Sequence, residues 1–393
     1  MDAATAAPWN LSPLLQLLLL GALLAAVPLA WIALRHRAPA ARLRALTGLT
    51  LFLCFDLVLF GAFTRLTDSG LGCPDWPGCY GNASPLGAQH HIAAAQSLLP
   101  DGPVTHAKAW IEMLHRYFAT AVGALITVLA VMSWRLHRRG TPGVISPWWS
   151  TATLVWVCLQ GAFGALTVTM KLYPAIVTAH LLGGLGLLAL LAAQSQAFNG
   201  PGSRPLALTP GLRRGLWALA ALTLGQIALG GWVSTNYAVL ACSDFPTCQG
   251  RWWPDMDFAN GFTLQRALGS TGEGGNLPFP ALTAIHFTHR LMALALLAAL
   301  ALVAWRLVRL NDAQARRWAG ALLALGAWQL ASGVSNVVLG WPLLAAVAHT
   351  GGAAALTVTL SLMLMRAHSG ARLAAVPARR GAPPDLVPGA RYR

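Results

Sequence analysis

Residues 110–134 read WIEMLHRYFATAVGALITVLAVMSW. The segment is long and apolar enough to cross a bilayer, because a hydrocarbon core of about 30 Å needs roughly 20 residues of helix. A helix satisfies its own backbone hydrogen bonds and can therefore span lipid. The segment predicts a transmembrane helix that carries an acid, a histidine and an arginine near its first end.

Further apolar runs of similar length make this helix one of nine. They lie near residues 12–34, 46–64, 147–169, 174–197, 214–236, 281–305, 317–338 and 342–365. The chain is 56% hydrophobic and only 10% charged, which is too apolar for a soluble globule. The first run has neither the charged start nor the small-residue cleavage site of a signal peptide, so we expect a retained anchor. The sequence predicts an all-α polytopic membrane protein.

The net charge of +15 comes mainly from arginines in alternate loops. They follow the first, third, fifth and seventh runs and recur in the tail, for example Arg35, Arg44, Arg135, Arg138, Arg213, Arg214, Arg306, Arg309, Arg317 and Arg366. By the positive-inside rule these segments are cytoplasmic, which places the N-terminus outside and the C-terminus inside. Topology thus explains the charge, and no nucleic-acid partner is expected.

An internal repeat with an offset of 169 residues organises the chain. The matching residues are Gly61, Cys73, Cys79, Gln160, Gly164 and His180 with Gly230, Cys242, Cys248, Gln329, Gly333 and His349. We predict two pseudo-symmetric four-helix bundles, residues 46–198 and 214–366, joined by a cytoplasmic linker, 199–213. Residues 1–45 form an extra N-terminal helix and a basic loop, and residues 367–393 a disordered tail. Because the repeat is parallel, equivalent sites lie at equal depth.

Four histidines, two in each half, lie near the outer ends of predicted helices: His115, His180, His289 and His349. Polar groups inside a bilayer are costly and usually functional, and imidazole is the usual neutral ligand of haem iron. A single such histidine more often bonds to a neighbouring helix, but a repeated set of four favours haem ligation. A zinc site would want Cys, Asp or Glu beside them.

Charged residues accompany these histidines. Arg116 and Arg290 follow their histidines directly and could pair with haem propionates or reach the lipid headgroups; Arg65 is a weaker propionate candidate. Glu112, three residues before His115, has His286 at the matching place in the second half, so we assign chemistry to the first half. The alternative for Glu112 is an ion pair with Arg116.

Two pairs of cysteines lie in the predicted outer loops, Cys73 with Cys79 and Cys242 with Cys248. An oxidising compartment favours a disulfide in each loop, worth about 2 to 3 kcal/mol in the chain-entropy model. A redox-active pair that exchanges electrons with a partner is the alternative.

Taken together, these motifs resemble the haem A synthase family. They are Glu-x-x-His-Arg at 112–116, the His-Arg pair of the second half, the segment from Thr64 to Leu71, and an outer cysteine pair. The resemblance implies that His289 and His349 hold haem b, and that His115 and His180 bind the substrate haem O with Glu112 as the catalytic residue. The C8 methyl of haem O would become a formyl group through successive hydroxylations with oxygen from water. The extra N-terminal helix and the second cysteine pair depart from the usual family pattern.

The resemblance also implies surroundings and partners. We expect a bacterial inner membrane, with the N-terminus periplasmic and the C-terminus cytoplasmic, and contacts with membrane lipid. Haem O synthase and cytochrome oxidase assembly factors are candidate partners, and an electron acceptor is required. The competing functions are a di-haem b-type membrane cytochrome that carries electrons, and a haem transporter or chaperone.

Overall fold

The computed structural model describes residues 11–198 and 205–375, which contain helices and no β-strand. The helices are α1 Ser12–Arg35, α2 Pro39–Leu66, α3 Gln89–Leu98, α4 His106–Arg138, α5 Trp148–Thr169, α6 Pro174–Phe198, α7 Pro210–Thr235, the 3₁₀ helix η2 Ala238–Leu240, α8 Phe258–Gly261, α9 Phe279–Val308, α10 Ala313–Val338 and α11 Leu343–Ala375. Within these ranges nine helices are long and apolar enough to cross a membrane. The predicted fold class is confirmed.

Polar residues and prolines set where the long helices begin. The side chains of Thr105, Thr209 and Asp312 each accept a hydrogen bond from a backbone N–H in the first turn of α4, α7 and α10. These caps satisfy donors that a helix start leaves free. Pro39 and Pro210 open α2 and α7, where the missing N–H costs nothing. Short polar sequences therefore mark the ends of otherwise continuous apolar runs.

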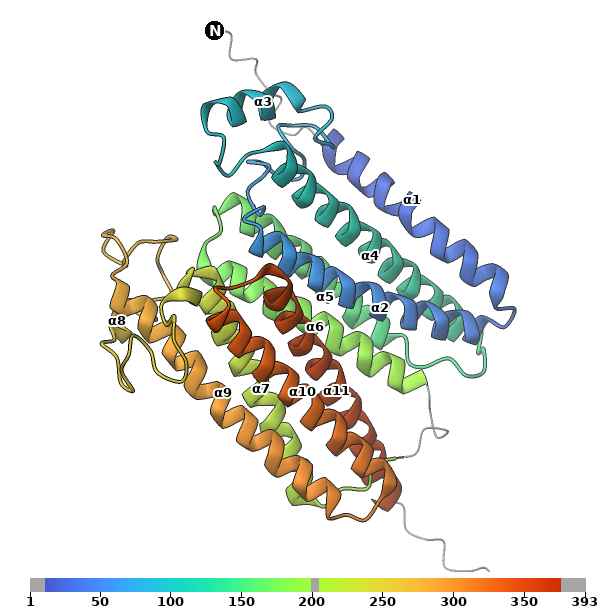
Figure 1. Cartoon of the computed structure of the whole chain (residues 1–393). Helices are drawn as coiled ribbons and strands as arrows, with labels where there is room; N and C mark the ends of the chain where they lie inside the picture. The colour runs from blue at the N-terminus through green and yellow to red at the C-terminus, as the bar shows by residue number, and fades with distance from the viewer. Residues whose placement is uncertain (1–10, 199–204, 376–393) are drawn as a thin grey trace, which may run out of the picture.

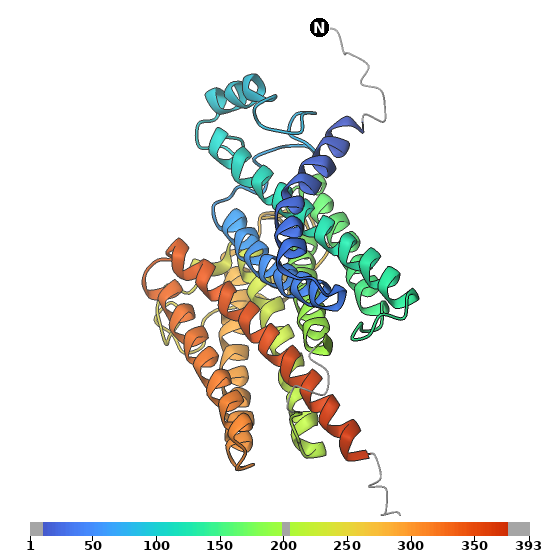
Figure 2. The same cartoon turned by 90° about the vertical axis from the view of Figure 1, so that its right-hand side faces the viewer.

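The long helices form two groups that lie side by side (Figures 1 and 2). One buried apolar cluster is built mainly from α2, α4 and α6, and a second from α7, α9, α10 and α11. The groups meet where α11 packs against α2 and α6 and where α7 packs against α6. Each half thus has its own core, and the helices that carry His180 and His349 lie at the junction between the halves.

The extra helix α1 lies along α4, as Figure 1 shows. Gly21 of α1 faces Thr120 of α4 so closely that a Cβ at this glycine would overlap the threonine. Leu18, Leu19 and Leu34 on α1 are more than half exposed, as suits side chains that face lipid. The structure gives α1 a definite place beside the first half.

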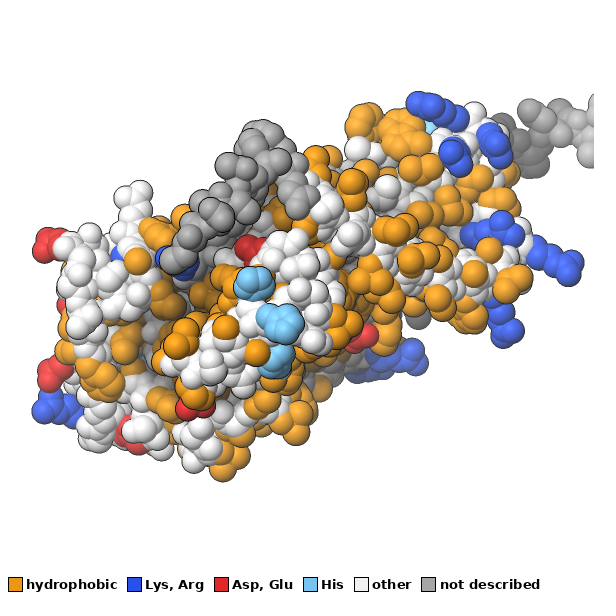
Figure 3. All heavy atoms as spheres, turned by 90° about the horizontal axis from the view of Figure 1, so that it is seen from above, with side chains coloured by type: hydrophobic (Ala, Val, Ile, Leu, Met, Phe, Trp, Pro, Cys, Tyr) orange, Lys and Arg blue, Asp and Glu red, His pale blue; other side chains and the backbone are white. Residues whose placement is uncertain are grey.

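The arginines of the alternate loops lie at one end of the helical bundle. Arg35 and Arg135 end α1 and α4, whereas Arg213 and Arg317 begin α7 and α10, and successive spans alternate in direction. Figure 3 shows the blue side chains gathered toward one end of the molecule and most of the visible acids toward the other. Helix α11 continues past the predicted end at 366 to Ala375, and the rest of the predicted tail lies outside the described residues, as do 199–204 of the linker.

Candidate functional site

The four histidines lie on facing helices, as one pair in each half. His115 of α4 is near enough to His180 of α6 for their rings to interact electrostatically, and the same is true of His289 of α9 and His349 of α11. His180 and His349 both lie six residues after the first residue of their helices. Both pairs therefore lie at matching depths, at the end of the bundle opposite the clustered arginines.

A glycine lies against each of the four imidazoles. A Cβ at Gly61 would come within 3.1 Å of His115, and one at Gly230 would come within 3.1 Å of His289. At Gly164 and Gly333 it would come within 3.4 and 3.3 Å of His180 and His349. The contacts at Gly61, Gly230 and Gly333 are tighter than most real Cβ contacts, so larger residues there would push on the rings, whereas a Cβ at Gly164 would only touch its ring. The repeated glycines found in the sequence thus make room for the repeated histidines.

The residues in each half fit a haem. A porphyrin supplies four nitrogen ligands itself and needs two axial groups, and each half offers two neutral imidazoles on opposing helices. The Nδ1 atom of His180 is buried and has no hydrogen-bond partner. Among the described residues, no group of three or more His, Cys, Asp or Glu is arranged to hold a metal ion. A site with two histidines suits an iron whose other ligands are the nitrogens of a porphyrin.

Glu112 is buried and joins α4 to the first outer loop. Its side chain is only 4% exposed. One carboxylate oxygen accepts a hydrogen bond of 2.8 Å from the backbone N–H of Cys73, and the other pairs with Arg116. The Arg116 guanidinium also donates to the carbonyl oxygens of Asp75, Pro77 and Gly78. The ion pair that was the alternative role of Glu112 is therefore present, its catalytic role stays a prediction, and the carboxylate lies beside the loop that contains Cys73.

In the second half, His286 stands at the position that matches Glu112. It also contacts a loop and the arginine four residues later, but it brings no carboxylate. Its Nδ1 lies 3.0 Å from the carbonyl oxygen of Ala238, and its Nε2 accepts a hydrogen bond of 3.2 Å from Arg290. Arg290 also donates to the carbonyl oxygens of Cys242, Asp244 and Thr247. Both arginines thus support the disulfide loops, and their contact with haem propionates stays a prediction.

The predicted disulfides are confirmed. Cys73 is bonded to Cys79 with Cα atoms 4.9 Å apart, and Cys242 to Cys248 with Cα atoms 4.6 Å apart. Both bridges are fully buried. Glu112 is therefore hydrogen-bonded to the backbone of a disulfide-closed loop.

An aspartate organises the turn in each disulfide loop. Asp75 accepts backbone hydrogen bonds from Tyr80 and Gly81, and Asp244, 169 residues later, accepts them from Gln249 and Gly250. The hydrogen bond from Thr247, followed by those from the backbone, holds the pKa of Asp244 below its usual value. Sequence reasoning did not single out this aspartate pair, although its recurrence at the repeat offset was a signal.

Arg65 lies at the junction of the halves. It pairs with Asp68 at 3.1 Å, donates to the carbonyl oxygen of Ser234 at 2.6 Å, and stacks 4.2 Å from the centre of the Tyr237 ring. Tyr237 in turn donates to Asp68 at 2.5 Å. The structure thus gives Arg65 protein partners, and its predicted propionate contact remains untested.

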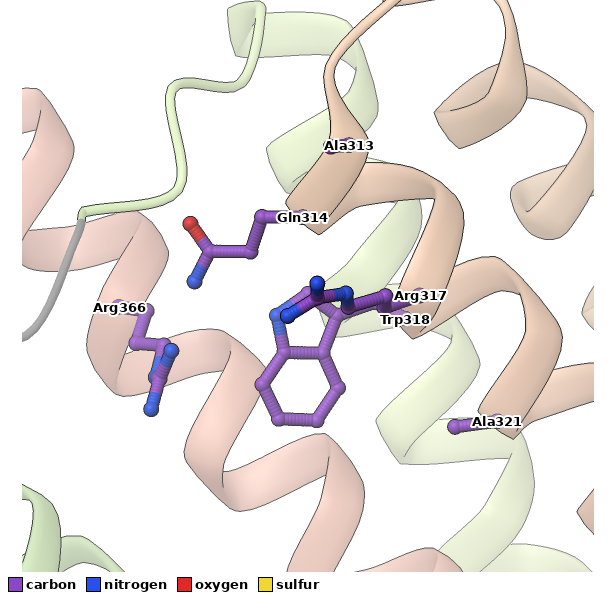
Figure 4. Close-up of a pocket in the computed structure, with 6 residues that line it drawn as sticks. All are labelled: Ala313, Gln314, Arg317, Trp318, Ala321 and Arg366. Carbon is purple, nitrogen blue, oxygen red and sulfur yellow. The ribbon is translucent and has the colours of Figure 1, made fainter.

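A shallow cavity of about 460 Å³ lies away from the histidines (Figure 4). Its lining residues are Ala313, Gln314, Arg317, Trp318, Ala321 and Arg366. The Arg366 guanidinium lies 5.4 Å from the centre of the Trp318 ring. Arg366 is roughly 25 Å along α11 from His349, at 1.5 Å per residue. The cavity therefore belongs to the arginine-rich end and is separate from the candidate haem sites.

Comparison with known proteins gives one consistent result. The family model COX15-CtaA, described as "Cytochrome oxidase assembly protein", matches residues 44–361. "Heme A synthase" of Shewanella oneidensis is 39% identical over 319 residues, which cover 80% of this chain and 93% of the relative. "Heme A synthase" of Caulobacter vibrioides is 30% identical and that of Halalkalibacterium halodurans 26% identical, each over 79% of this chain and over 92% and 91% of the relative. The residues that the family model matches include all four histidines of the two pairs.

Proposed function

The chain belongs to the COX15-CtaA family of cytochrome oxidase assembly proteins, and we propose from this membership that it is a haem A synthase. It is an oxidoreductase that converts the C8 methyl group of haem O into the formyl group of haem A. The structural observation that carries this conclusion is the pair of two-histidine sites, each cradled by glycines. The carboxylate of Glu112 beside the first site is matched by the imidazole of His286 beside the second, which supports different roles for the halves.

The two halves divide the work between substrate and cofactor. Residues 46–198 bind haem O through His115 and His180, and residues 214–366 hold haem b through His289 and His349. The linker 199–213 joins them. When bound by these two histidines, haem b would supply a one-electron redox centre. The buried Glu112, opposite the neutral His286, supports placing the reaction in the first half.

The reaction removes electrons and protons from a methyl group. Each hydroxylation adds the oxygen of one water and releases two electrons and two protons, and loss of water from the hydrated aldehyde leaves the formyl group. Glu112 accepts protons near the reacting methyl, because it is the acid beside His115. Cys73 and Arg116 hold the carboxylate in place. The electrons pass to an acceptor outside the chain.

The protein lies in a bacterial inner membrane, with its N-terminus periplasmic and its C-terminus cytoplasmic. The arginines at one end of the bundle support this orientation, and oxidised outer loops support a periplasmic location for the disulfides. Haem O synthase supplies the substrate, and cytochrome oxidase assembly factors receive the product.

Incubation of the purified protein with haem O and an electron acceptor tests the proposal. We expect a product with the mass and the retention time of haem A in chromatography. The variant His115→Ala should retain haem b and form no haem A, whereas His289→Ala should lose haem b. Unchanged haem O under these conditions, with haem bound in both halves, would instead indicate an electron-carrying cytochrome.

A further inference from the structure

The histidines of the second half have hydrogen-bond partners that belong to neighbouring helices. Nδ1 of His349 lies 2.9 Å from the hydroxyl oxygen of Ser332 on α10. Nδ1 of His289 lies 3.1 Å from the side-chain amide of Gln226 on α7, which also donates to the backbone oxygen of His289 at 3.2 Å. A second-shell partner of this kind fixes the tautomer and the orientation of a ligating imidazole.

The Ser332 hydroxyl oxygen can accept a hydrogen bond from the ring of His349. It donates its own hydrogen to the carbonyl oxygen of Trp328 at 2.7 Å, so its lone pairs face His349. The Nδ1–H of His349 can then donate to Ser332, which leaves the lone pair of Nε2 for iron. Tautomer and orientation are thus set by protein atoms.

Gln226 contacts both the ring and the backbone of His289. Its amide nitrogen lies 3.1 Å from Nδ1 and 3.3 Å from Nε2 of the ring, and it donates to the backbone oxygen of His289 at 3.2 Å. One side chain of α7 therefore holds the edge of the ring and the backbone of α9 at the same residue.

The first half lacks both partners. The positions that match Gln226 and Ser332 at the repeat offset of 169 are Leu57 and Phe163, which cannot hydrogen-bond. Nδ1 of His180 is buried without a partner, and the ring of His115 packs 6.0 Å from the ring of Phe60. Among the described residues, no group hydrogen-bonds to Nδ1 of His180, the counterpart of the Nδ1 that Ser332 contacts in His349.

We propose that Gln226 and Ser332 are positioning residues that make the haem of the second half permanent, and that Leu57 and Phe163 leave the haem of the first half exchangeable. The inference rests on the proposed function, since a substrate must enter and leave whereas a cofactor must stay. Loss of a second-shell partner typically costs roughly 10- to 100-fold in metal affinity. The asymmetry between the halves is therefore large enough to separate a bound cofactor from a released product.

Transfer of haem from the purified holoprotein to excess apomyoglobin tests this inference. In Gln226→Leu and in Ser332→Ala, release of haem b should accelerate by roughly 10- to 100-fold. In Ser332→Ala the midpoint potential of haem b should also rise, because an imidazole that no longer donates to the hydroxyl is less basic and stabilises ferric iron less. Ser332→Thr keeps the hydroxyl and should behave like the wild type.

Matched controls lie one turn away on the same helices. Thr223 and Ser335 donate only to backbone oxygens of their own helices, so Thr223→Ala and Ser335→Ala should leave release rate and potential unchanged. In the opposite direction, Leu57→Gln should slow haem release from the first half. Wild-type release and potential in both Gln226→Leu and Ser332→Ala would overturn the inference.

These readouts do not depend on haem O oxidation. If release accelerates as expected but no haem A forms in the wild type, the positioning role stands and the proposed function fails. If haem A forms but release does not change, the positioning role fails alone. If Ser332→Ala does not accumulate as folded protein, the rate of haem release from Gln226→Leu tests the inference, because this substitution lies on a different helix.

Discussion

Glu112 anchors a loop through the backbone of Cys73, and we propose a second, catalytic role for the same carboxylate. Glu112→Gln keeps the shape of the side chain but removes the charge that pairs with Arg116. We expect the haem b spectrum to remain and haem A formation to fall by roughly 10²- to 10⁴-fold, the usual contribution of a general acid or base. Quantification of extracted haems measures the effect.

The matched control for this change is Glu273→Gln, which alters an exposed acid in an outer loop of the other half. It should form haem A at the wild-type rate. Wild-type activity of Glu112→Gln would remove the carboxylate from the mechanism and leave it only the loop contact.

We expect a substitution at a glycine beside a histidine to affect only the haem of the same half. A branched side chain in Gly230→Val would press on His289, whereas one in Gly61→Val would press on His115. We expect Gly230→Val to lose haem b, and Gly61→Val to keep haem b but fail to bind haem O. Absorption spectra and haem content after purification distinguish these outcomes.

Glycines with open surroundings on the same helices provide the controls. A Cβ at Gly48 of α2 or at Gly215 of α7 would meet no atom within 4 Å. The variants Gly48→Ala and Gly215→Ala should therefore retain both haems. Equal loss of haem from all four variants would show that helix propensity, not contact with the histidine, is responsible.

At the scale of elements, the second disulfide loop depends on an ionised carboxylate. The pKa of Asp244 is held below its usual value of about 3.9, chiefly by the hydrogen bond from Thr247. A depressed pKa contributes stability above the ordinary value, and this stability is lost as the pH falls through the folded-state pKa. We expect the amides of Gln249 and Gly250 to exchange hydrogen faster, relative to their intrinsic rates, below about pH 4.

Asp244→Asn tests this dependence directly. An amide side chain does not titrate, so the protection of these two amides should no longer change with pH in this range. Persistent pH dependence in the variant would assign the transition to another group.

The contact between α1 and α4 is a second test at this scale. In Gly21→Leu the new side chain would overlap Thr120, and overpacking of this kind costs typically about 1 to 3 kcal/mol. We expect a lower midpoint temperature of unfolding and faster proteolysis near α1. Leu18→Ala, on the exposed face of the same helix, should change neither. An unchanged midpoint in Gly21→Leu would mean that α1 does not depend on this contact.

The sequence predicted the membrane-spanning helices best. Nine apolar runs predicted nine spans, because a bilayer requires continuous apolar helices, and the helices match those runs with ends extended by caps such as Thr105 and Thr209. Helices α3 and α8 were not predicted. They lie in loops between the spans, where the sequence has no long apolar run that would indicate a helix. The disulfides followed from spacing and compartment.

At the scale of the whole molecule, the two halves meet around an approximate twofold axis. Arg65 contacts Ser234, and Asp68 contacts Tyr237, and the residues of each pair are 169 positions apart. Residues related by the repeat can touch only near the axis that relates the halves, so this outer cluster lies on it. A search for identical residues at the repeat offset could not find these pairs, because their members differ in type.

The same limitation applies to Gln226 and Ser332. Their partners in the repeat are apolar, so only the structure brings them to the histidines. The histidines themselves were found because both halves keep them. Shared residues thus reveal what the halves have in common, and three-dimensional contacts reveal how they differ.

Identification of the haems extracted from protein purified from cells that also make haem O tests the central claim most directly. We predict haem A together with haem b, and haem O with haem b in Glu112→Gln. Haem b alone, at two per chain and without conversion of added haem O, would contradict the assignment and describe an electron-carrying cytochrome.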